Sequence, residues 1–443
     1  MIQTINFSQY PKLNLLLLLV TVISISLYSS QSTAATQKLS NTEETIELSN
    51  NIEFTYQHFK ANKQANNTNT AALWILPGYP HQDRFYEFSQ GLSDNGIEVW
   101  MVNILDNLFK PKGVNSTRSL NGKYVAELIK KIHQKTNKNV ILIAESYNAI
   151  PVLRGAFEWQ KSQPKKRYLT GAVLFSPNLF KAIPTLGEKP EFVEITKYTT
   201  IPILLYQSEK SNTRGQLQEL LSLLQNNNAS VYTTMMKNAI AIFYLEDKTP
   251  ETLQYLKTLP TTITASLKLL ESSPLPLFTK TVKLKTSNKS TQLDSSLKKY
   301  KAKNHPLKIN LKDVSGKVFI KSNYKNQITI VNFWATWCKP CLEEIPSLNR
   351  LQAKMKNKAF EIISINYAEK PEKIKTFMKS VNIDFPVLIN ESGDQAVKWH
   401  VFAFPSTFVI GPDGEFHYGV NAGILWDTPE VIETLNKLYK PDL

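Results

Sequence analysis

The sequence predicts two consecutive α/β domains, a doubly wound parallel sheet followed by a smaller α/β unit. Short apolar runs alternate with amphipathic stretches between residues 45 and 271, and this alternation is typical of a mostly parallel sheet with helices on both faces. A lysine-rich segment, residues 272–304, interrupts the pattern, which then resumes from 305 to 443. The length of 443 residues allows two or three domains of about 100–200 residues each.

Apolar runs of three to nine residues indicate the strands of both domains. In the first domain the stretch Leu120–Lys135 carries apolar residues three to four positions apart, as one face of a helix requires. The expected strands of the first domain are Ala71–Leu76, Ile97–Leu105, Val140–Ala144, Gly171–Phe175, Ile201–Tyr206 and Val231–Met235. Those of the second domain are Ile328–Trp334, Phe360–Asn366, Val387–Ile389 and Thr407–Ile410.

The N-terminus has the pattern of a secretory signal peptide over residues 1–35. Lys12 precedes the apolar stretch Leu13–Tyr28, which is shorter than the about 20 residues of a membrane span, and small residues follow it. No cysteine lies near the expected cleavage region, which excludes lipoprotein attachment. We therefore expect an exported protein of the periplasm or cell envelope, with an uncleaved membrane anchor as the alternative.

The basic charge is concentrated in one part of the chain. The formal net charge is +15, and the segment Phe278–Lys325 alone holds 13 lysines and two aspartates. Few aromatic residues lie between these lysines, and a recognisable nucleic-acid-binding motif is missing, which favours a solvated linker over a nucleic-acid site. Weak contact with an anionic membrane surface is the remaining functional interpretation.

The chain has only two cysteines, Cys338 and Cys341, and both lie in one Cys-x-x-Cys motif. The motif follows the expected strand Ile328–Trp334 and begins a helical stretch, where free backbone N–H groups stabilise a thiolate. A zinc site would need further ligands, and His305 and His400 are far along the chain. A structural bridge over so short a loop would remove little chain entropy. The motif therefore predicts a redox-active dithiol without a metal or other cofactor.

Three further segments accompany the cysteine pair and carry a family resemblance. Asn332–Cys341 reads NFWATWCKPC, Glu343–Pro346 reads EEIP, Phe404–Ile410 reads FPSTFVI, and Pro412–Gly414 reads PDG. Together they resemble the TlpA-type thiol-disulfide oxidoreductases, exported relatives of thioredoxin, over roughly residues 306–443. Ala403 and Ser406 stand where that family often has Gly and Thr, which makes the substrate preference harder to predict.

The resemblance implies roles for individual residues. It assigns Cys338 as the nucleophile, Cys341 as the resolving thiol and Pro405 as the cis-proline beside the disulfide. Trp337 and Phe404 are then expected at the substrate-binding surface. For Glu344 two interpretations stay open, a proton shuttle beside the dithiol and an exposed helix residue.

The resemblance also implies partners. The substrates would be thiols and disulfides of exported proteins, with reduction favoured, for example of cytochrome apoproteins that await haem. A membrane electron-donor protein would supply the reducing equivalents. The direction of exchange depends on the redox potential, which the sequence does not supply.

A weaker resemblance concerns the first domain, residues 45–271. The strand Val140–Ala144 leads into Glu145, Ser146 and Asn148, a sequence similar to the strand and nucleophile elbow of an α/β-hydrolase. No histidine occurs between His133 and His305, so Ser146 lacks the base that the family supplies late in the chain.

Two interpretations of the first domain therefore remain. A hydrolase-like domain without a complete triad would act as a binding module, with Ser146 as a vestigial site. Alternatively, the protein is a serine esterase that uses Ser146, with a regulatory thioredoxin domain. His81, in a loop similar to an oxyanion segment, and Glu209, after the strand Ile201–Tyr206, are the residues that such an enzyme would have to recruit.

Overall fold

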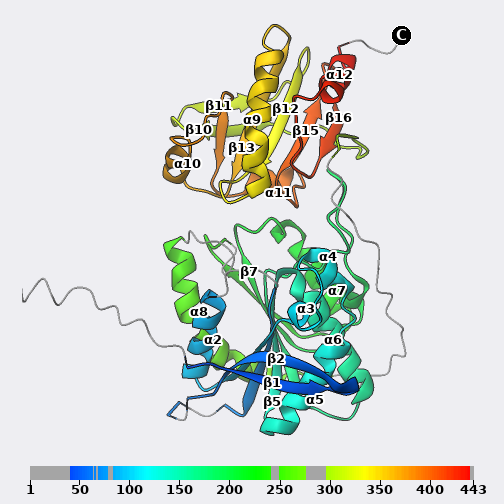
Figure 1. The fold of residues 1–443 in the computed structure, drawn as a ribbon, viewed down its shortest axis with the longest axis vertical. Helices are drawn as coiled ribbons and strands as arrows, with labels where there is room; N and C mark the ends of the chain where they lie inside the picture. Colours follow the sequence, from blue (N-terminus) through cyan, green and yellow to red (C-terminus); the bar gives the residue numbers. More distant parts are fainter. Residues whose placement is uncertain are drawn as a thin grey trace, which may run out of the picture. The chain divides into compact units, whose positions relative to one another are not determined.

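The computed structural model describes residues 40–62, 64–65, 68–77, 83–240, 249–275 and 296–439 (Figure 1). The predicted signal peptide, residues 1–35, and His81 lie outside the described residues. Among the helices of the described ranges, none combines the length and apolar character needed to cross a bilayer.

The first sheet has the strand order β1-β2-β4-β3-β5-β6-β7-β8 in the described part of the chain. From β4 to β8 all neighbours are parallel, whereas β1, β2 and β4 pair antiparallel at one edge. Its strands are β1 (Thr42–Leu48), β2 (Ile52–Phe59), β3 (Thr70–Ile75), β4 (Glu98–Val102), β5 (Asn139–Glu145), β6 (Leu169–Phe175), β7 (Ile203–Ser208) and β8 (Val231–Met236).

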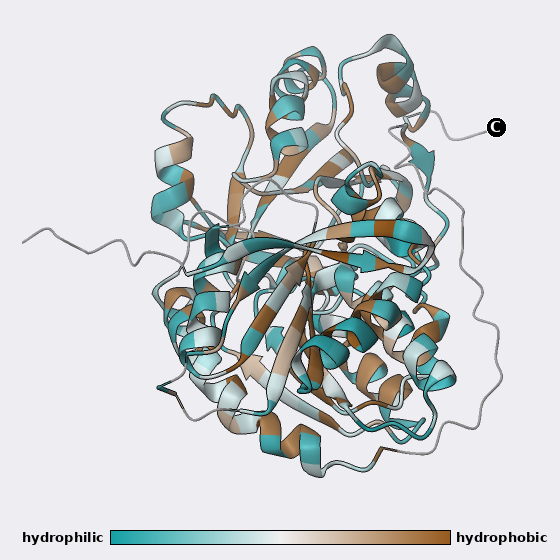
Figure 2. Cartoon of the chain, turned by 60° about the horizontal axis from the view of Figure 1, so that its bottom comes forward, coloured by the Kyte–Doolittle hydropathy of each residue, from teal (hydrophilic) through white to brown (hydrophobic). Residues whose placement is uncertain are grey.

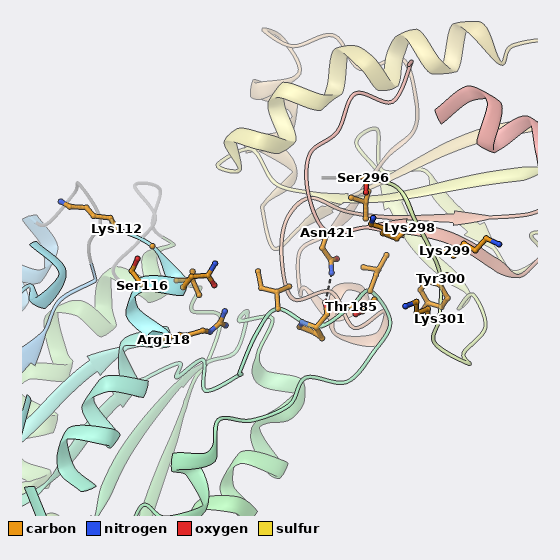
Figure 3. A pocket seen from close by; sticks show the side chains of 18 residues that line it. Lys112, Ser116, Arg118, Thr185, Ser296, Lys298, Lys299, Tyr300, Lys301 and Asn421 are labelled. Atoms are coloured by element: carbon orange, nitrogen blue, oxygen red, sulfur yellow. Dashed lines mark hydrogen bonds between the residues drawn. The ribbon is translucent and has the colours of Figure 1, made fainter. Parts of the chain in front are cut away.

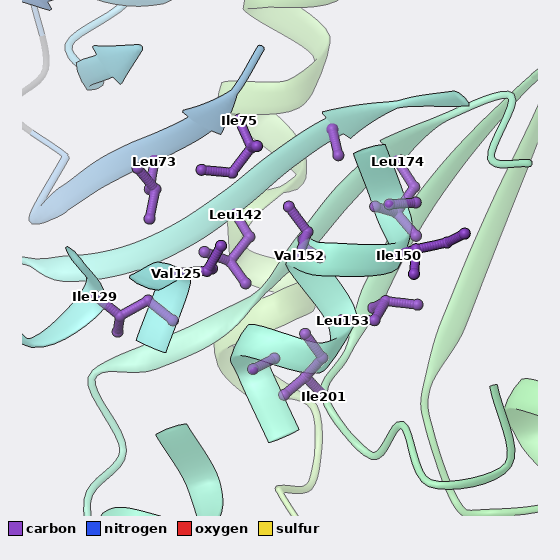
Figure 4. Close-up of a cluster of buried hydrophobic side chains, with 14 of the residues drawn as sticks. Leu73, Ile75, Val125, Ile129, Leu142, Ile150, Val152, Leu153, Leu174 and Ile201 are labelled. Atoms are coloured by element: carbon purple, nitrogen blue, oxygen red, sulfur yellow. The ribbon is translucent and has the colours of Figure 1, made fainter. Parts of the chain in front are cut away.

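Side chains that alternate along these strands enter two separate cores. Leu73 and Ile75 of β3 pack with Leu142 of β5 and with helices α5, α6 and α7 (Figure 4). Ala72 and Trp74, which point the other way, pack against α2 and α8. The sheet is thus covered on both faces, as its largely hydrophobic strands require (Figure 2). The helices are α2 (Asp83–Asp94), α5 (Lys123–Thr136), α6 (Ala149–Ser162), α7 (Leu217–Gln225) and α8 (Pro250–Ser272).

The structure differs from the sequence-based expectation in two places of this sheet. The hairpin of β1 and β2 was not among the expected strands, because β1 is largely exposed and its apolar residues are few. The expected strand Ile97–Leu105 ends at Val102, since the Asn103 side chain accepts a hydrogen bond from the N–H of Asp106 and begins a helix there. The short helical segments are η2 (Ser49–Asn51), α3 (Ile104–Asn107), α4 (Val114–Ser119), η3 (Ser146–Asn148), η4 (Glu194–Lys197) and η5 (Arg214–Gln216).

The second sheet has the order β11-β10-β14-β13-β12-β15-β16-β9. Its centre is β12, which pairs parallel with β13 and antiparallel with β15. The strands are β9 (Lys298–Lys299), β10 (Ile309–Asp313), β11 (Val318–Lys321), β12 (Ile328–Trp334), β13 (Phe360–Tyr367), β14 (Val387–Asn390), β15 (Ser406–Ile410) and β16 (Phe416–Val420). The helices are α9 (Lys339–Lys354), α10 (Pro371–Phe377), α11 (Asp394–Lys398) and α12 (Pro429–Lys437).

Helices cover both faces of this sheet as well. Leu348 of α9 and Leu435 of α12 pack on Ile330, whereas Trp399, directly after α11, packs on Phe333. The segment predicted as a linker, 272–304, contributes to the sheet at its end, because β9 pairs antiparallel with β16. A run of lysines can form an edge strand when its backbone finds a neighbour, which composition alone does not reveal.

A cluster of charged side chains links the β1–β2 hairpin to its neighbour β4 in the first sheet. Each ring nitrogen of His58 lies 2.8 Å from a carboxylate oxygen, one of Glu44 and one of Glu98. Glu98 also accepts hydrogen bonds from Trp100 at 2.9 Å and pairs with Lys138 at 3.0 Å. Burial opposes ionisation of Glu98, but the bonds from His58 and Lys138 outweigh it and lower its pKa to about 2.

Replacing Glu98 is expected to loosen the β1–β2 hairpin. At pH 7, Glu98→Gln should cost at least about 2 kcal/mol, because it leaves buried donors without their carboxylate. A carboxylate with a lowered pKa stabilises the fold above its unfolded pKa, and this stability is lost as the pH falls toward 2. The difference from the parent should therefore shrink between about pH 4.5 and pH 2. Hydrogen exchange of the hairpin amides measures it.

The control is Glu433→Gln, which removes an exposed pair with Lys437 and should change stability by less than about 0.5 kcal/mol. Equal protection of the hairpin in the parent and in Glu98→Gln at pH 7 would contradict the role given to Glu98.

Candidate active site

The two cysteines lie where β12 gives way to α9. Cys338 is the N-cap residue of the helix, and Cys341 lies in its first turn. They form a disulfide with an S–S distance of 2.03 Å. The backbone N–H of Cys341 donates to the Cys338 sulfur at 3.3 Å. After reduction, this donor and the positive end of the helix dipole stabilise negative charge on Cys338.

The two sulfur-bearing residues differ in access to solvent. Cys341 is fully buried, whereas Cys338 retains 5% exposure and follows Trp337, which is 39% exposed. An incoming protein thiol or disulfide therefore reaches Cys338 first. This asymmetry agrees with the attacking role expected for Cys338 and the resolving role expected for Cys341.

A buried carboxylate, which the sequence reasoning did not single out, holds the loop before the cysteines. Glu369 follows β13 and accepts hydrogen bonds from both the N–H (2.7 Å) and the hydroxyl (2.6 Å) of Thr336. Asn366 donates to Glu369 at 2.8 Å, and Lys373 pairs with it at 2.8 Å. The only signal in the sequence is an acidic residue just after a buried strand. Its partner, Thr336, is 33 positions away, so the contact exists only in the tertiary structure.

The loop before β15 forms the other side of the site. The Phe404–Pro405 peptide bond is cis, and Pro405 is buried. The Phe404 ring meets Trp337 edge-on at 5.7 Å between centroids and contacts Tyr367 at 4.6 Å. Phe404 also packs on the apolar cluster that contains both cysteines. The structure thus brings the expected residues Trp337, Phe404 and Pro405 together beside the disulfide.

Glu344 lies inside the domain, so it is not the exposed helix residue that one interpretation expected. Its residue exposure is 2%, and its carboxylate accepts from Asn332 at 2.8 Å and from Trp426 at 3.1 Å. Burial raises the pKa of Glu344 to about 7, despite these two hydrogen bonds. It lies one turn after Cys341 on the same helix, so the interior next to the dithiol holds a carboxyl group whose pKa is close to neutral pH.

Ser146 in the first domain has the backbone of a strained turn between strand and helix. Its φ is +52°, it follows β5 directly, and η3 and α6 follow it. Its burial is intermediate, and its hydroxyl has no hydrogen bond within the described ranges. His58 is held by two carboxylates, and His133 stacks on Tyr168. Neither described histidine of this domain is therefore a base for Ser146.

The other residues that a hydrolase would need do not assemble around Ser146. Glu209 accepts a hydrogen bond from the N–H of Asn238 at 2.8 Å, and no histidine takes part in that contact. Among the described residues, no group of three or more His, Cys, Asp or Glu side chains forms a cluster that would hold a metal ion.

A thioredoxin-like α/β fold with a dithiol at the start of a helix defines the class of the second domain. Residues 301–418 match the family model described as AhpC/TSA family. The chain is 33% identical over 131 residues to the thiol-disulfide oxidoreductase ResA of Bacillus subtilis (strain 168), covering 30% of this chain and 72% of that protein. The chain therefore belongs to the family of ResA-type thiol-disulfide oxidoreductases.

Other similarities concern the same region. The chain is 37% identical over 103 residues to ResA of Bacillus thuringiensis subsp. konkukian (strain 97-27), which is 23% of this chain and 60% of that protein. It thus spans about three fifths of the length of that relative. A solved thiol:disulfide interchange protein of the thioredoxin family, from Chlorobium tepidum TLS, is 24% identical with a TM-score of 0.27, covering 31% of this chain and 99% of that one.

The raised pKa of Glu344 predicts a pH-dependent stability of the oxidised protein. A carboxyl group whose folded pKa exceeds its unfolded value of 4.5 stabilises the fold fully below pH 4.5, and this stability is lost as the pH rises through about 7. Glu344→Gln should remove this dependence, which amounts to at most about 3 kcal/mol. Urea unfolding midpoints between pH 4 and 9 measure it.

Glu343→Gln is the matched control, because Glu343 is its neighbour on the same helix but 65% exposed at its side chain. This variant should keep the pH profile of the parent. The same profile in Glu344→Gln as in the parent would show that Glu344 does not titrate in this range.

Proposed function

We propose that the second domain catalyses thiol–disulfide exchange on exported proteins, with reduction of the substrate as the favoured direction. The observation that carries the proposal is the placement of Cys338, slightly exposed at the start of α9, directly over the buried Cys341. The ring of Phe404 and the buried Pro405 stand beside this pair and offer a surface for an extended substrate segment.

The reaction begins from the reduced dithiol. The Cys338 thiolate attacks one sulfur of the substrate disulfide, which forms a mixed disulfide and releases the other substrate sulfur as a thiolate. Cys341 then loses its proton and attacks the Cys338 sulfur. This step forms the Cys338–Cys341 disulfide and releases the second substrate thiol, so that two electrons pass to the substrate.

The proton of Cys341 needs an acceptor in a buried place. Glu344 lies one turn further along α9, in the same interior, and burial raises its pKa to about 7. At neutral pH it is therefore able both to accept and to return a proton. Its hydrogen bonds to Asn332 and Trp426 keep the carboxyl group in place.

The N-terminal residues suggest the location, and the electron balance of the reaction suggests a partner. Residues 1–35 would direct the chain to the periplasm or cell envelope, as a cleaved signal peptide or as an uncleaved anchor. The oxidised protein must regain two electrons after each cycle. A membrane electron-donor protein with a dithiol of its own would supply them, by the same exchange in the reverse sense.

Reduction of insulin disulfides in the presence of dithiothreitol tests this proposal. Cys338→Ser should fall to the rate of dithiothreitol alone, because no attacking sulfur remains. Reduced Cys341→Ser, freed of dithiothreitol before insulin is added, should instead accumulate a mixed disulfide with insulin, visible by mass spectrometry. Ser146→Ala keeps both cysteines and should retain the parent rate.

The midpoint potential of the cysteine pair distinguishes catalysis from a structural role. A value near that of thioredoxin, about −270 mV, fits a reductant, and one toward about −120 mV fits an oxidant. Full insulin reduction by Cys338→Ser, or a pair that resists reduction below about −300 mV, would contradict the proposal.

For the first domain we propose a binding role on a hydrolase-like fold. What supports the likeness is Ser146, held at φ +52° between β5 and α6 at the carboxyl edge of a parallel sheet. What argues against hydrolysis is the engagement of His58 and His133 elsewhere. The esterase alternative rests on the same Ser146.

Hydrolysis of short p-nitrophenyl esters decides between these two candidates. We expect the parent and Ser146→Ala to hydrolyse them at the same background rate, because a serine hydroxyl without a base is a poor nucleophile. The esterase alternative requires that the parent exceeds this background and that Ser146→Ala loses the excess.

A further inference from the structure

Arg118 is a buried arginine whose side chain has no partner among the described residues. It lies on α4, and the residue is only 7% exposed. Its Nε is buried without a hydrogen bond, and its guanidinium group forms no ion pair within the described ranges. A buried charge without a partner lowers the free energy of unfolding, so a group of this kind destabilises the fold.

A second buried arginine increases the positive charge of this region. Arg154 of α6 donates to the backbone carbonyl of Leu120 at 2.7 Å and also to that of Arg118. It therefore adds a positive charge next to Arg118 and occupies two carbonyl acceptors of the same segment. Burial alone lowers the pKa of Arg118 to about 10, and burial also lowers that of Arg154. Neither pKa is raised by a carboxylate, so the charge of this region is not compensated from within the described chain.

Arg118 lines a pocket whose walls are basic and apolar (Figure 3). The lining contains Arg118 and four lysines, and no aspartate or glutamate. Lys112 among them pairs with Asp106 at 3.1 Å, so Arg118 is the buried cation of the pocket that has no such pair. Val114 and Ile183 contribute apolar surface to the same lining.

The chemistry of such a lining selects a ligand class. A guanidinium group offers two parallel N–H donors that match the two oxygens of a carboxylate or phosphate. An apolar surface beside it favours a ligand with a hydrocarbon body over an inorganic ion. α4, which carries Arg118, also contacts η3, the turn that begins at Ser146, although Ser146 is not in the lining.

We propose that this pocket binds an organic oxyanion, with the anionic head on Arg118 and the apolar body against Val114 and Ile183. The inference rests on the binding role proposed for the first domain, which supplies Arg118, Val114 and Ile183, and it gives that role a ligand class. The other three lysines of the lining, Lys298, Lys299 and Lys301, lie at and beside β9 of the second sheet. Binding supplies the negative charge that Arg118 lacks among the described residues. It needs neither the hydroxyl of Ser146 nor the two cysteines.

Isothermal titration of the full chain with decanoate, decyl phosphate and decanol tests the proposal. Decanoate or decyl phosphate should bind at least about tenfold more tightly than decanol, and the better of the two identifies the head group. Arg118→Gln should weaken anion binding at least about tenfold, since hydrogen bonds to charged groups are worth a tenfold factor or more. Decanol should bind both proteins alike.

Arg167→Gln, which removes an exposed arginine outside this pocket, is the matched control and should bind the anions as the parent does. Equal anion affinity of the parent and Arg118→Gln would overturn the proposal, as would an absence of anion binding by the parent at millimolar concentration.

Stability and redox activity provide independent readouts. Because the Arg118 side chain has no partner to lose within the described part of the chain, Arg118→Gln should have a urea midpoint equal to or above that of the parent. A strongly lowered midpoint would reveal a structural partner of Arg118 and overturn the proposal. Insulin reduction should be unchanged in Arg118→Gln, so a failure of anion binding is distinguishable from a failure of the redox function.

Discussion

The redox site depends on the full burial of one strand, β12. Every residue of Ile328–Trp334 is buried, and the strand forms backbone hydrogen bonds with β13 on one edge and β15 on the other. Its end is therefore fixed in position. Only three residues separate Trp334 from Cys338, and so short a loop restricts the position of the Cys338 sulfur. Glu369 fastens that short loop through Thr336. The dithiol is therefore presented by rigid elements, as a site that exchanges sulfur bonds requires.

The same strand also holds Glu344, the residue for which we propose a role in proton transfer. Asn332 of β12 donates both to Glu344 on α9 and to Thr407 on β15, at 2.8 and 2.9 Å. A buried carboxyl group with two donors has a defined place, yet burial keeps its pKa near 7. Arg118 in the first domain is the opposite case, since its buried charge has no partner in the described chain. Buried charges thus mark both regions where we place function.

Much of the architecture was predictable from apolar runs. β12 was predicted with its bounds, and β13, β14 and β15 differ from expectation by one residue, because buried strands of a central sheet are nearly continuous in hydrophobic residues. The hairpin of β1 and β2 was missed, since an exposed edge strand lacks that signal. In the candidate site, Cys338, Cys341, Pro405 and Glu344 were predicted from motifs. Glu369 and Trp426 were not, because no local pattern surrounds them.

The sequence by itself determined the chemistry of this protein, since two cysteines in one motif before a helix, in an otherwise cysteine-free chain, leave few other uses for them. The environment of the buried charged groups was decided only by the tertiary structure. Burial raises the pKa of Glu344 to about 7, and Trp426, which donates a hydrogen bond to its carboxylate from 82 positions away, partly opposes that rise. The proposal for Arg118 likewise depends on the fold, which buries this side chain without an acidic partner among the described residues. Burial and contacts between distant residues arise only when the chain is packed, and for that reason they could not be predicted from the local sequence.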